Sequence, residues 1–328
     1  MIQNCPGGAN GQAQWKCGPY GWQRPTPDLS ACSSVWMMTL DRRVRDGEVI
    51  PKISSELAQV TNTSKELYGG DLVIATKLLK LMAEKMAKES NFQDPGQRES
   101  VVSDLLQGAV TTGSNLLDAA QALSWKDLDY KNQTKVATDL LKGLEENAYL
   151  QADIIHGTKR IIHKQRNIFM EVRILEARKI SSELQVFPDE LSDERWASLH
   201  DRVELTKRAL MDNDNRDGYV RLVFMAFDRL EEILQPEYPS PFSNELQDNE
   251  EGEERRESNV TSILNSKVIS ASLGKGRHVQ LSEPVRIYFR HLTLDNVTNP
   301  KCVYWDYPAR YVPRLHIDLY LIFSLSIS

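Results

Sequence analysis

The sequence has no long hydrophobic run, no excess of basic residues and no signal-peptide pattern. Residues 319–327, LYLIFSLSI, are the closest approach to a membrane span, at about half the roughly 20 apolar residues that one needs. The net charge of −6 disfavours general nucleic-acid binding, which requires a basic surface. The opening residues, MIQNCPGGANGQ, lack the basic and then apolar layout of a signal peptide. We therefore expect neither an export signal nor a membrane anchor in the chain as written.

Motifs for catalysis and phosphate binding are missing as well. The sequence has no G-x-S-x-G, P-loop or G-x-G-x-x-G motif. Its carboxylates lie in charge runs rather than in pairs framed by apolar residues, so none can be singled out as a general acid. The stretch NDNRDGYVRL partly fits a calcium loop, but the position that needs a bidentate Glu falls on Phe224. We expect no enzymatic activity on a separate substrate, no cofactor and no metal.

Cysteine is scarce and unevenly placed. Cys5, Cys17 and Cys32 crowd into the first tenth of the chain, and Cys302 stands alone near residue 300. Dense cysteines in a segment rich in Gly, Pro and Trp indicate a small disulfide module, because so few residues cannot form an adequate core. Zinc is disfavoured, since no pair has C-x-x-C spacing and no His lies near. An odd count leaves one thiol without a local partner, and the pairing stays open.

Asn-x-Ser/Thr acceptors for N-glycosylation are present despite the missing signal peptide. Each occurs easily by chance, but together with the cysteines they favour a secretory compartment. The four acceptors are Asn62, Asn132, Asn259 and Asn296.

Residues 33 to about 163 have a helical pattern. Apolar residues recur at steps of three and four in three segments, residues 71–90, 99–123 and 134–162, which predicts three or more helices that pack as a bundle. Asp71 is the expected N-cap of the first of these helices. His156 and His163 are expected at a solvated basic helix end, since metal-binding pairs prefer a spacing of four. The apolar stripe is Leu72, Ala75, Leu79, Met82 and Met86 in the first segment, and Val136, Leu140, Leu144 and Ala148 in the third.

From residue 168 the period changes to two. Ile168, Met170, Val172 and Ile174 alternate with polar residues at 171 and 173, which predicts a half-buried strand with Glu171 and Arg173 on its solvent side. Similar segments follow without long helices between them, which favours an antiparallel sandwich. These segments are YVRLVFMAF, SKVISASL and RHVQLSEPVRIYFRHL.

The predicted fold class is α+β. We expect a partial cysteine module over residues 1–32, a helical bundle over 33–165 and an incomplete antiparallel β-sandwich over 166–307. Within the last, residues 236–258 contain prolines followed by an acidic run, typical of a solvated loop.

Several of these segments resemble the adhesion G-protein-coupled receptors. CPGGANGQAQWKCGPYGWQRPTPDLSAC resembles the second half of their hormone-receptor-like domain. SWKDLDYKNQTKVATDLLKGLEENAYLQAD is similar to the helical part of their GPCR-autoproteolysis-inducing (GAIN) domain, of the latrophilin type in particular. CVYWDY resembles the start of their proteolysis-site motif. The resemblance covers residues 5 to 307, and the segments match in the family's order.

The resemblance implies structural roles for Trp22, Trp305 and the four cysteines. In the family, the Cys-x-x-Trp element is followed by three more cysteines and then by a self-cleaving His-Leu-Thr/Ser triplet. Here His291-Leu292-Thr293 precedes Cys302, so we expect no cleavage there and no catalytic residue. The tail 308–328 matches nothing in the family, which predicts a truncated proteolysis-site motif and a sandwich with an exposed edge.

The resemblance also implies partners and a location. A full-length receptor of this kind resides in the plasma membrane with this region outside the cell. Its partners are its own seven-helix membrane domain, a G protein and cell-surface adhesion ligands, without nucleic acid. The main function hypothesis is therefore a fragment of the extracellular juxtamembrane region, serving cell adhesion and signalling, without the transmembrane domain or a functional cleavage site. Two alternatives stay open: an intracellular helical scaffold, and a self-cleaving domain that uses His291 and Thr293.

Overall fold

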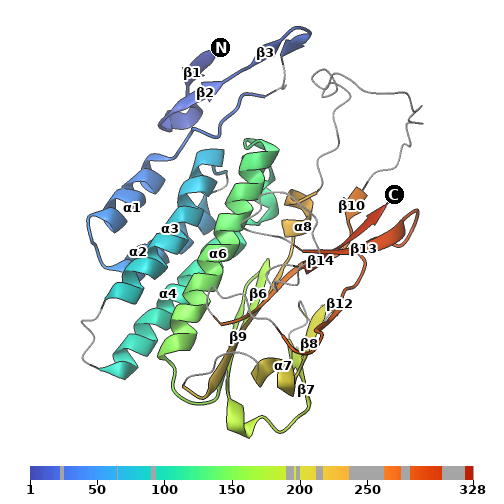
Figure 1. The fold of residues 1–328 in the computed structure, drawn as a ribbon. Helices are drawn as coiled ribbons and strands as arrows, with labels where there is room; N and C mark the ends of the chain where they lie inside the picture. The colour runs from blue at the N-terminus through green and yellow to red at the C-terminus, as the bar shows by residue number, and fades with distance from the viewer. Residues whose placement is uncertain are drawn as a thin grey trace, which may run out of the picture.

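The computed structural model describes residues 1–22, 26–64, 66–89, 94–189, Trp196, 200–211, 217–235, 262–274, 281–304 and, as backbone, 322–327. They form an N-terminal module, a layer of helices and two antiparallel sheets (Figure 1). The predicted α+β class is confirmed. Trp305, Asn259, the loop 236–258 and most of the tail 308–328 lie outside the described residues.

The N-terminal module consists of two small hairpins closed by a disulfide. Strands β1 (Ile2–Asn4) and β2 (Gln12–Gln14) form one hairpin, and β3 (Cys17–Gly18) and β4 (Gly21–Trp22) form the other. Cys5 and Cys32 are bonded, with their Cα atoms 5.7 Å apart. Gly11 has a φ of +111°, and a Cβ there would lie 2.0 Å from the Ala31 carbonyl oxygen. Only glycine lets the two segments approach this closely.

The helices follow the predicted apolar stripes. All nine stripe residues named in the sequence analysis are buried in one cluster, because each helix turns its apolar face toward its neighbours. α3 packs on α6 and α2 packs on α4. The helices are α1 (Val35–Arg45), α2 (Ile50–Thr63), α3 (Gly69–Lys88), α4 (Pro95–Leu116), α5 (Ala122–Lys126) and α6 (Tyr130–Ile154).

The predicted start of α3 is wrong by three residues. The N-cap is Tyr68, and Asp71 lies one turn inside the helix, where its Oδ2 accepts a hydrogen bond from the Tyr68 backbone N–H at 3.0 Å. A Gly-Gly pair is ordinarily a loop signal. Here Gly69 and Gly70 are helical, and the missing side chains let the disulfide module approach: a Cβ on Gly70 would lie 2.3 Å from the Cys32 carbonyl oxygen.

The larger sheet has the order β10–β14–β11–β9–β6–β5, with β13 on the other edge of β14. The smaller sheet has the order β12–β8–β7. Every strand pair is antiparallel, as the sequence predicts. The strands are β5 (Lys159–Lys164), β6 (Ile168–Glu176), β7 (Leu184–Phe187), β8 (Arg202–Thr206), β9 (Tyr219–Phe227), β10 (Ser262–Leu264), β11 (Val268–Leu273), β12 (Arg286–Tyr288), β13 (Thr298–Tyr304) and β14 (Ile322–Ile327). Two short helices, α7 (Lys207–Met211) and α8 (Leu230–Ile233), connect strands.

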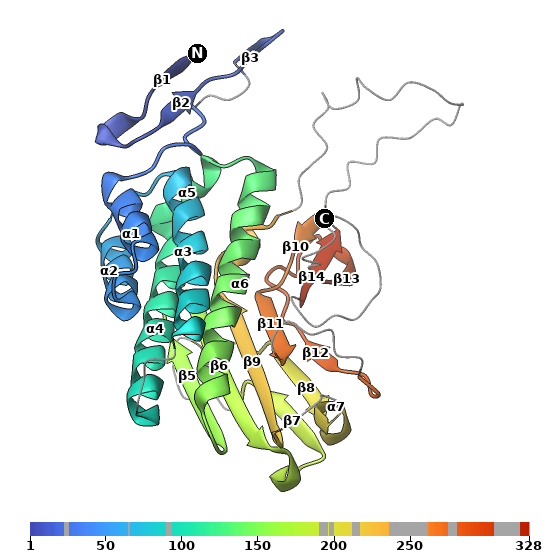
Figure 2. The same ribbon diagram turned by 60° about the vertical axis from the view of Figure 1, so that its left-hand side comes forward.

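The larger sheet is covered on both faces. The helices α4 and α6 pack against one face, and β7, β8 and α7 lie on the other side (Figure 2). One hydrophobic cluster therefore joins the helices to one face of the sheet through Val172, Val223 and Met225. A second cluster lies between the two sheets and includes Phe169 and Phe224.

This arrangement corrects the prediction of a half-buried strand at 168–176. The period of two is right, but Glu171 is fully buried and Arg173 is 7% exposed. Glu171 accepts hydrogen bonds from Arg173 and, at 3.0 Å, from Arg160 Nε. The Arg173 guanidinium lies 4.5 Å from the centre of the Phe187 ring. A charge can be buried when it is paired and hydrogen-bonded in this way.

Two further predictions are wrong at the end of the helical segment. Residues 159–164 form β5 at the edge of the sheet rather than the end of α6. His163 is consequently a buried strand residue, with Nδ1 2.8 Å from Gln107 Oε1 of α4, whereas His156 is exposed as expected. Residues 322–327, within the tail 308–328, form β14.

Candidate functional site

The His291-Leu292-Thr293 triplet lies beyond β12. Its segment is not a strand, but its backbone is hydrogen-bonded to a neighbouring residue as a strand would be. The Thr293 backbone N–H donates to Asn265 Oδ1 at 2.8 Å, and Asn265 Nδ2 donates to the Thr293 carbonyl at 2.9 Å. The Leu292 N–H donates to the Asn265 carbonyl at 3.0 Å. The side-chain amide of a 1% exposed Asn thus replaces the backbone of a neighbouring strand.

A second buried side chain fixes the same segment. Asp201 Oδ1 accepts a hydrogen bond from the Arg290 backbone N–H at 2.7 Å. Burial raises the pKa of the Asp201 carboxyl, and the Arg290 hydrogen bond opposes that shift. The segment 290–293 is therefore attached to the loop after β10 and to the start of β8.

An ion-pair cluster lies beside this attachment. Lys267 Nζ contacts Asp228 and lies 2.9 Å from Glu231 Oε1. Burial acts to lower the pKa of Lys267, but the hydrogen bonds and charges of Asp228 and Glu231 outweigh it, and the pKa is raised. Burial raises the pKa of Glu231 as well. The cluster connects the loop between β10 and β11 to the turn that precedes α8.

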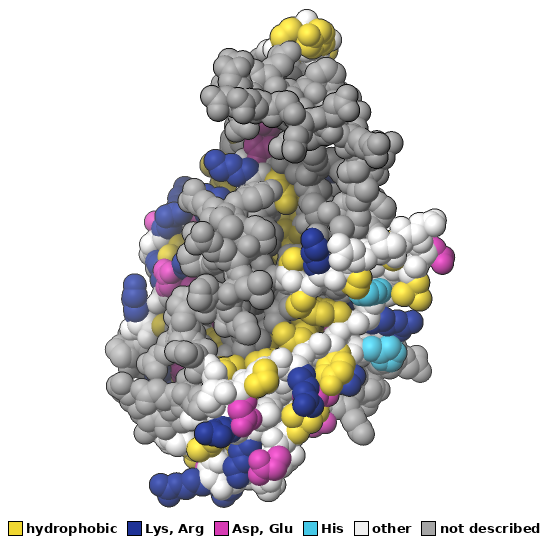
Figure 3. Space-filling model, turned by 45° about the vertical axis from the view of Figure 1, so that its right-hand side comes forward, with side chains coloured by type: hydrophobic (Ala, Val, Ile, Leu, Met, Phe, Trp, Pro, Cys, Tyr) yellow, Lys and Arg dark blue, Asp and Glu magenta, His cyan; other side chains and the backbone are white. Residues whose placement is uncertain are grey.

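The triplet does not present the arrangement that peptide cleavage needs. A nucleophilic hydroxyl must be activated by a base and held against a carbonyl. Thr293 is exposed, and its hydroxyl has no hydrogen-bond partner within the described part of the chain. Leu292 and Leu294 are exposed too, at 48% and 77%. Figure 3 shows hydrophobic side chains and histidine side chains close together on the face that it draws.

The cysteines of the two ends differ in state. The predicted disulfide module is present, and its bond is Cys5–Cys32. Cys17 and Cys302 are exposed and free. Cys17 is the register partner of Trp22, which is 57% exposed, and Cys302 lies on β13. Trp305 lies outside the described residues.

Three of the glycosylation acceptors are at the surface. Asn62 lies in α2, Asn132 in the first turn of α6, and Asn296 in the turn before β13, where its φ is 57°. All three are exposed. Their side chains are therefore accessible to modification.

The junction of the disulfide module with the bundle is a second polar centre, which sequence reasoning missed. Asp71 is fully buried and accepts hydrogen bonds from both Ser34 N and Ser34 Oγ at 2.7 Å. The Tyr68 hydroxyl donates to the Pro6 carbonyl at 2.9 Å. Burial raises the pKa of Asp71, and its hydrogen bonds from Ser34 and Tyr68 oppose the shift. The module is therefore fixed to the start of α3 rather than tethered loosely.

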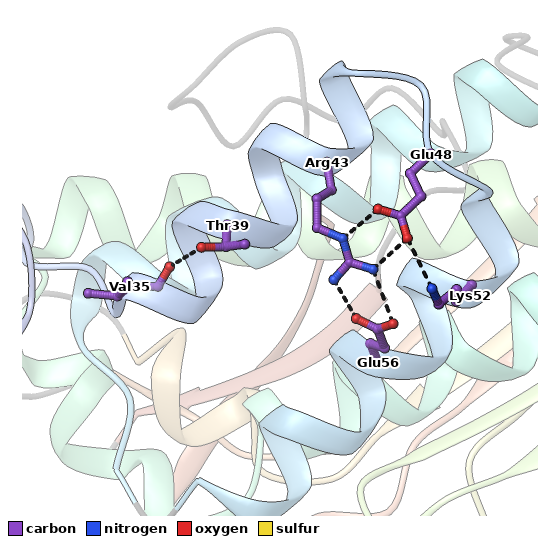
Figure 4. Close-up of polar contacts among 6 residues, drawn as sticks. All are labelled: Val35, Thr39, Arg43, Glu48, Lys52 and Glu56. Carbon is purple, nitrogen blue, oxygen red and sulfur yellow. Dashed lines mark hydrogen bonds and ion pairs between the residues drawn. The ribbon is translucent and has the colours of Figure 1, made fainter.

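A partly buried ion-pair network fixes the turn between α1 and α2 (Figure 4). Arg43 Nε lies 2.6 Å from Glu48 Oε2, and Arg43 Nη1 lies 2.5 Å from Glu56 Oε2. The Arg43 hydrogen bonds lower the pKa of Glu48 to about 2. Lys52 adds a contact with Glu48. The forked geometry of arginine allows it to hold two carboxylates at once.

The described residues contain no group of His, Cys, Asp and Glu side chains that could hold a metal ion. No described helix is long and apolar enough to cross a membrane. Sequence reasoning missed Asn265, Asp201 and Lys267. The only signal was the polar triplet Asn265-Ser266-Lys267 inside the apolar stretch SILNSKVIS.

Comparisons with known proteins agree with this architecture. The family model "AGRL2-4 GAIN subdomain A" matches residues 35–152, and the model "GAIN subdomain B" matches residues 162–311. Latrophilin Cirl of Drosophila ananassae is 44% identical over 303 residues, which are 87% of this chain and 17% of that protein. Adhesion G protein-coupled receptor L1 of Bos taurus is 31% identical over 323 residues, 93% of this chain and 21% of that protein.

The chain thus spans about a fifth or less of the length of these relatives. Within that span, the bundle corresponds to the first family model and the strands from β6 to β13 to the second. The chain belongs to the latrophilin-like adhesion G-protein-coupled receptors, of which it carries the GAIN region.

Proposed function

We propose that this chain serves as an extracellular juxtamembrane module of a latrophilin-like adhesion receptor, in cell adhesion and signalling. The observation that carries the proposal is the single hydrophobic cluster shared by the helices and the larger sheet. Close-packed interiors transmit displacement rather than absorb it. A pull on the N-terminal module would reach the sheet through Asp71, α3 and α6 without passing a flexible joint.

In this proposed role the polypeptide catalyses no reaction, and the peptide bond between Leu292 and Thr293 stays intact. Support comes from the attachment of Thr293 through its backbone N–H and carbonyl to Asn265, which stabilises the intact peptide. Exposure of the Thr293 side chain adds support, since water competes with any base for its hydroxyl. The alternative of a self-cleaving domain requires two fragments on a denaturing gel.

The disulfide and the exposed asparagines support a secretory location. The Cys5–Cys32 bond suits an oxidising compartment, and Asn62, Asn132 and Asn296 are accessible to modification. In the whole receptor, the partners would be its seven-helix domain, a G protein and adhesion ligands. The alternative of an intracellular scaffold predicts reduced cysteines and unmodified asparagines.

The test is a chimeric receptor. This chain would replace the corresponding region of latrophilin Cirl, and surface delivery, chain integrity and G-protein signalling would be measured in cells. We expect delivery to the surface as one uncleaved chain that carries N-glycans and signals when the N-terminal module is pulled. Retention inside the cell, or signalling indifferent to the pull, would overturn the proposal. A chimera with the cognate region reinserted is the control.

A further inference from the structure

We propose that the outward face of the smaller sheet binds a linear sulfated polysaccharide of the glycosaminoglycan class. The binding surface is the arginine ribbon, which consists of His200, Arg202, Arg286, Tyr288 and Arg290 on β8, β12 and the residues next to them. The choice of an extracellular ligand rests on the proposed function. Binding is measured on the purified chain, so the ribbon and the receptor role can fail independently of each other.

The two faces of the smaller sheet differ in character. Ile287 of β12 lies opposite Val203 of β8, and both pack in the hydrophobic cluster between the two sheets. Successive side chains of a strand point to opposite faces. Arg286 and Tyr288 therefore lie on the outward face, together with Arg202, the register partner of Tyr288. In agreement with this direction, Arg286 and Tyr288 are exposed.

The ribbon continues beyond the paired positions. Arg290 is exposed, whereas Phe289, between Tyr288 and Arg290, packs against the cluster between the sheets. The Arg290 backbone N–H is held by Asp201 Oδ1 at 2.7 Å. His200, next to Asp201 in the sequence, is exposed as well. Side chains on one face of a strand follow each other at about 6.6 Å, so the ribbon presents its basic groups along a line.

A buried carboxylate orders the middle of the ribbon. Glu204 is 8% exposed, and its Oε1 accepts a hydrogen bond from Arg202 Nε at 3.2 Å. Its Oε2 accepts a hydrogen bond from the Tyr288 hydroxyl at 3.2 Å. The Arg202 guanidinium lies 3.9 Å from the centre of the Tyr288 ring. Because both side chains are already held in place, less conformational freedom is lost when a ligand binds to them.

Two guanidinium groups of the ribbon are available to a ligand. Among the residues that the structure describes, the side chains of Arg286 and Arg290 have no hydrogen-bond or ion-pair partner. Their charge is therefore not neutralised locally, although the whole chain has a net charge of −6. An exposed line of positive charge attracts a polyanion. The planar fork of arginine suits the oxygens of a sulfate group, as it suits those of a phosphate or a carboxylate.

The ribbon fits a sulfated polysaccharide better than an anionic membrane. Anionic lipids give the cytoplasmic leaflet its negative potential, whereas this region is proposed to lie outside the cell. Tyr288 is 37% exposed, and an aromatic ring offers an apolar surface on which the carbon face of a sugar can pack. Figure 3 shows basic and histidine side chains among hydrophobic ones on the face that it draws.

Heparin binding by the purified chain, measured by surface plasmon resonance, is the test. The parent should bind immobilised heparin at low salt and release it as the salt concentration rises, because salt screens the attraction. The double variant Arg286→Gln, Arg290→Gln should bind about tenfold more weakly, since two charge-assisted contacts are lost. The control Arg42→Gln, Arg178→Gln removes the same charge from two other exposed sites and should bind within about twofold of the parent. Equal losses in the two double variants would overturn the ribbon.

Further measurements separate recognition of sulfate from loss of folding and from general attraction. Arg286→Lys with Arg290→Lys retains the charge without the fork and should bind with an affinity between those of the parent and the glutamine variant, with unchanged far-ultraviolet circular dichroism. Fully desulfated heparin should compete about tenfold less well than heparin, and phosphatidylserine vesicles should not compete. No heparin binding by the folded parent, or equal competition by desulfated heparin or by the vesicles, would overturn the proposal.

Discussion

The side chain of Asn265 pairs with the backbone of Thr293 at both polar groups, at 2.8 and 2.9 Å. The two residues lie 28 positions apart in the sequence, and both lie outside the strands. Their contact makes the segment after β12 an extension of the sheet. A triplet that looks like a cleavage signal in the sequence is therefore a structural attachment in the fold.

Asn265→Asp should destabilise the protein by about 1–3 kcal/mol, the cost of leaving a buried polar group unsatisfied. An aspartate cannot donate to the Thr293 carbonyl, so two acceptors would face each other. Urea unfolding followed by circular dichroism measures the change. Asn62→Asp, at an exposed position of α2, is the control and should stay within about 0.5 kcal/mol of the parent. Equal effects of the two substitutions would contradict the attachment.

Gly70→Ala should destabilise by about 1–3 kcal/mol, typical of an overpacked site. Alanine normally favours a helix over glycine, but here its Cβ would meet the Cys32 carbonyl oxygen at 2.3 Å. Thermal unfolding and protease susceptibility of residues 1–34 are the measurements. Gly96→Ala, near the start of α4, meets only the flexible Asp94 side chain at 3.3 Å and should be neutral or stabilising. A Gly70→Ala protein as stable as the parent would show that the module is not fixed to α3.

His163 should make stability depend on pH below neutrality. Burial lowers the pKa of its imidazole, and its Nε2 is buried without a hydrogen-bond partner among the described residues. The stability contributed by the neutral form is present above the unfolded-state pKa of 6.5 and is lost as pH falls toward the lower folded-state pKa. His163→Gln should flatten the decline in unfolding free energy between about pH 7 and pH 5. His156→Gln, at an exposed site, should leave the decline as in the parent; a flattened curve for both would refute the assignment.

The sequence predicts what depends on periodicity and fails where burial depends on distant partners. The stripe at Leu72 and Leu79 predicts its helix, because a bundle buries an apolar face whatever its neighbours are. The alternation at 168–174 predicts a strand, but not that a second sheet would cover Glu171. Glu171 can be buried because Arg173 and Arg160 neutralise its charge. The residue pattern of a single strand does not show whether a second sheet packs over it.

The candidate site, too, has features that the sequence predicts and features that depend on distant partners. Resemblance of motifs points to the GAIN region and to the absence of a cleavage turn at His291. It does not reveal Asn265 or Asp201, whose partners are 28 and 89 residues away. Strand β14 is not predicted, although apolar residues alternate with serine over residues 323–327. Long-range backbone pairing is fixed by the fold and not by local propensity.

Glu145 should make the parent less stable at neutral pH than an uncharged variant. This residue of α6 is 8% exposed, and its Oε1 is buried without a partner among the described residues. Burial raises the pKa of its carboxyl, the Ser272 hydrogen bond and the charge of Lys142 oppose the shift, and Glu146 adds to it. Tyr149, one turn further along α6, shares Ser272 at 3.1 Å. The carboxylate is therefore destabilised where α6 packs on β11.

The sign of the effect follows from the raised pKa. Below the unfolded-state value of 4.5, the folded and unfolded forms are both protonated and no stability is lost. As pH rises from 4.5 toward the higher folded-state pKa, the unfolded form loses its proton first and stability falls, and above the folded-state pKa the loss is complete. Glu145→Gln should therefore stabilise by about 1–3 kcal/mol at pH 8, because it removes a charge that burial has desolvated, and by little at pH 4. Glu84→Gln, on the exposed side of α3, should show no such pH dependence in urea unfolding. A Glu145→Gln protein that is less stable than the parent at pH 8 would mean that the carboxylate is satisfied by contacts that stabilise its charge.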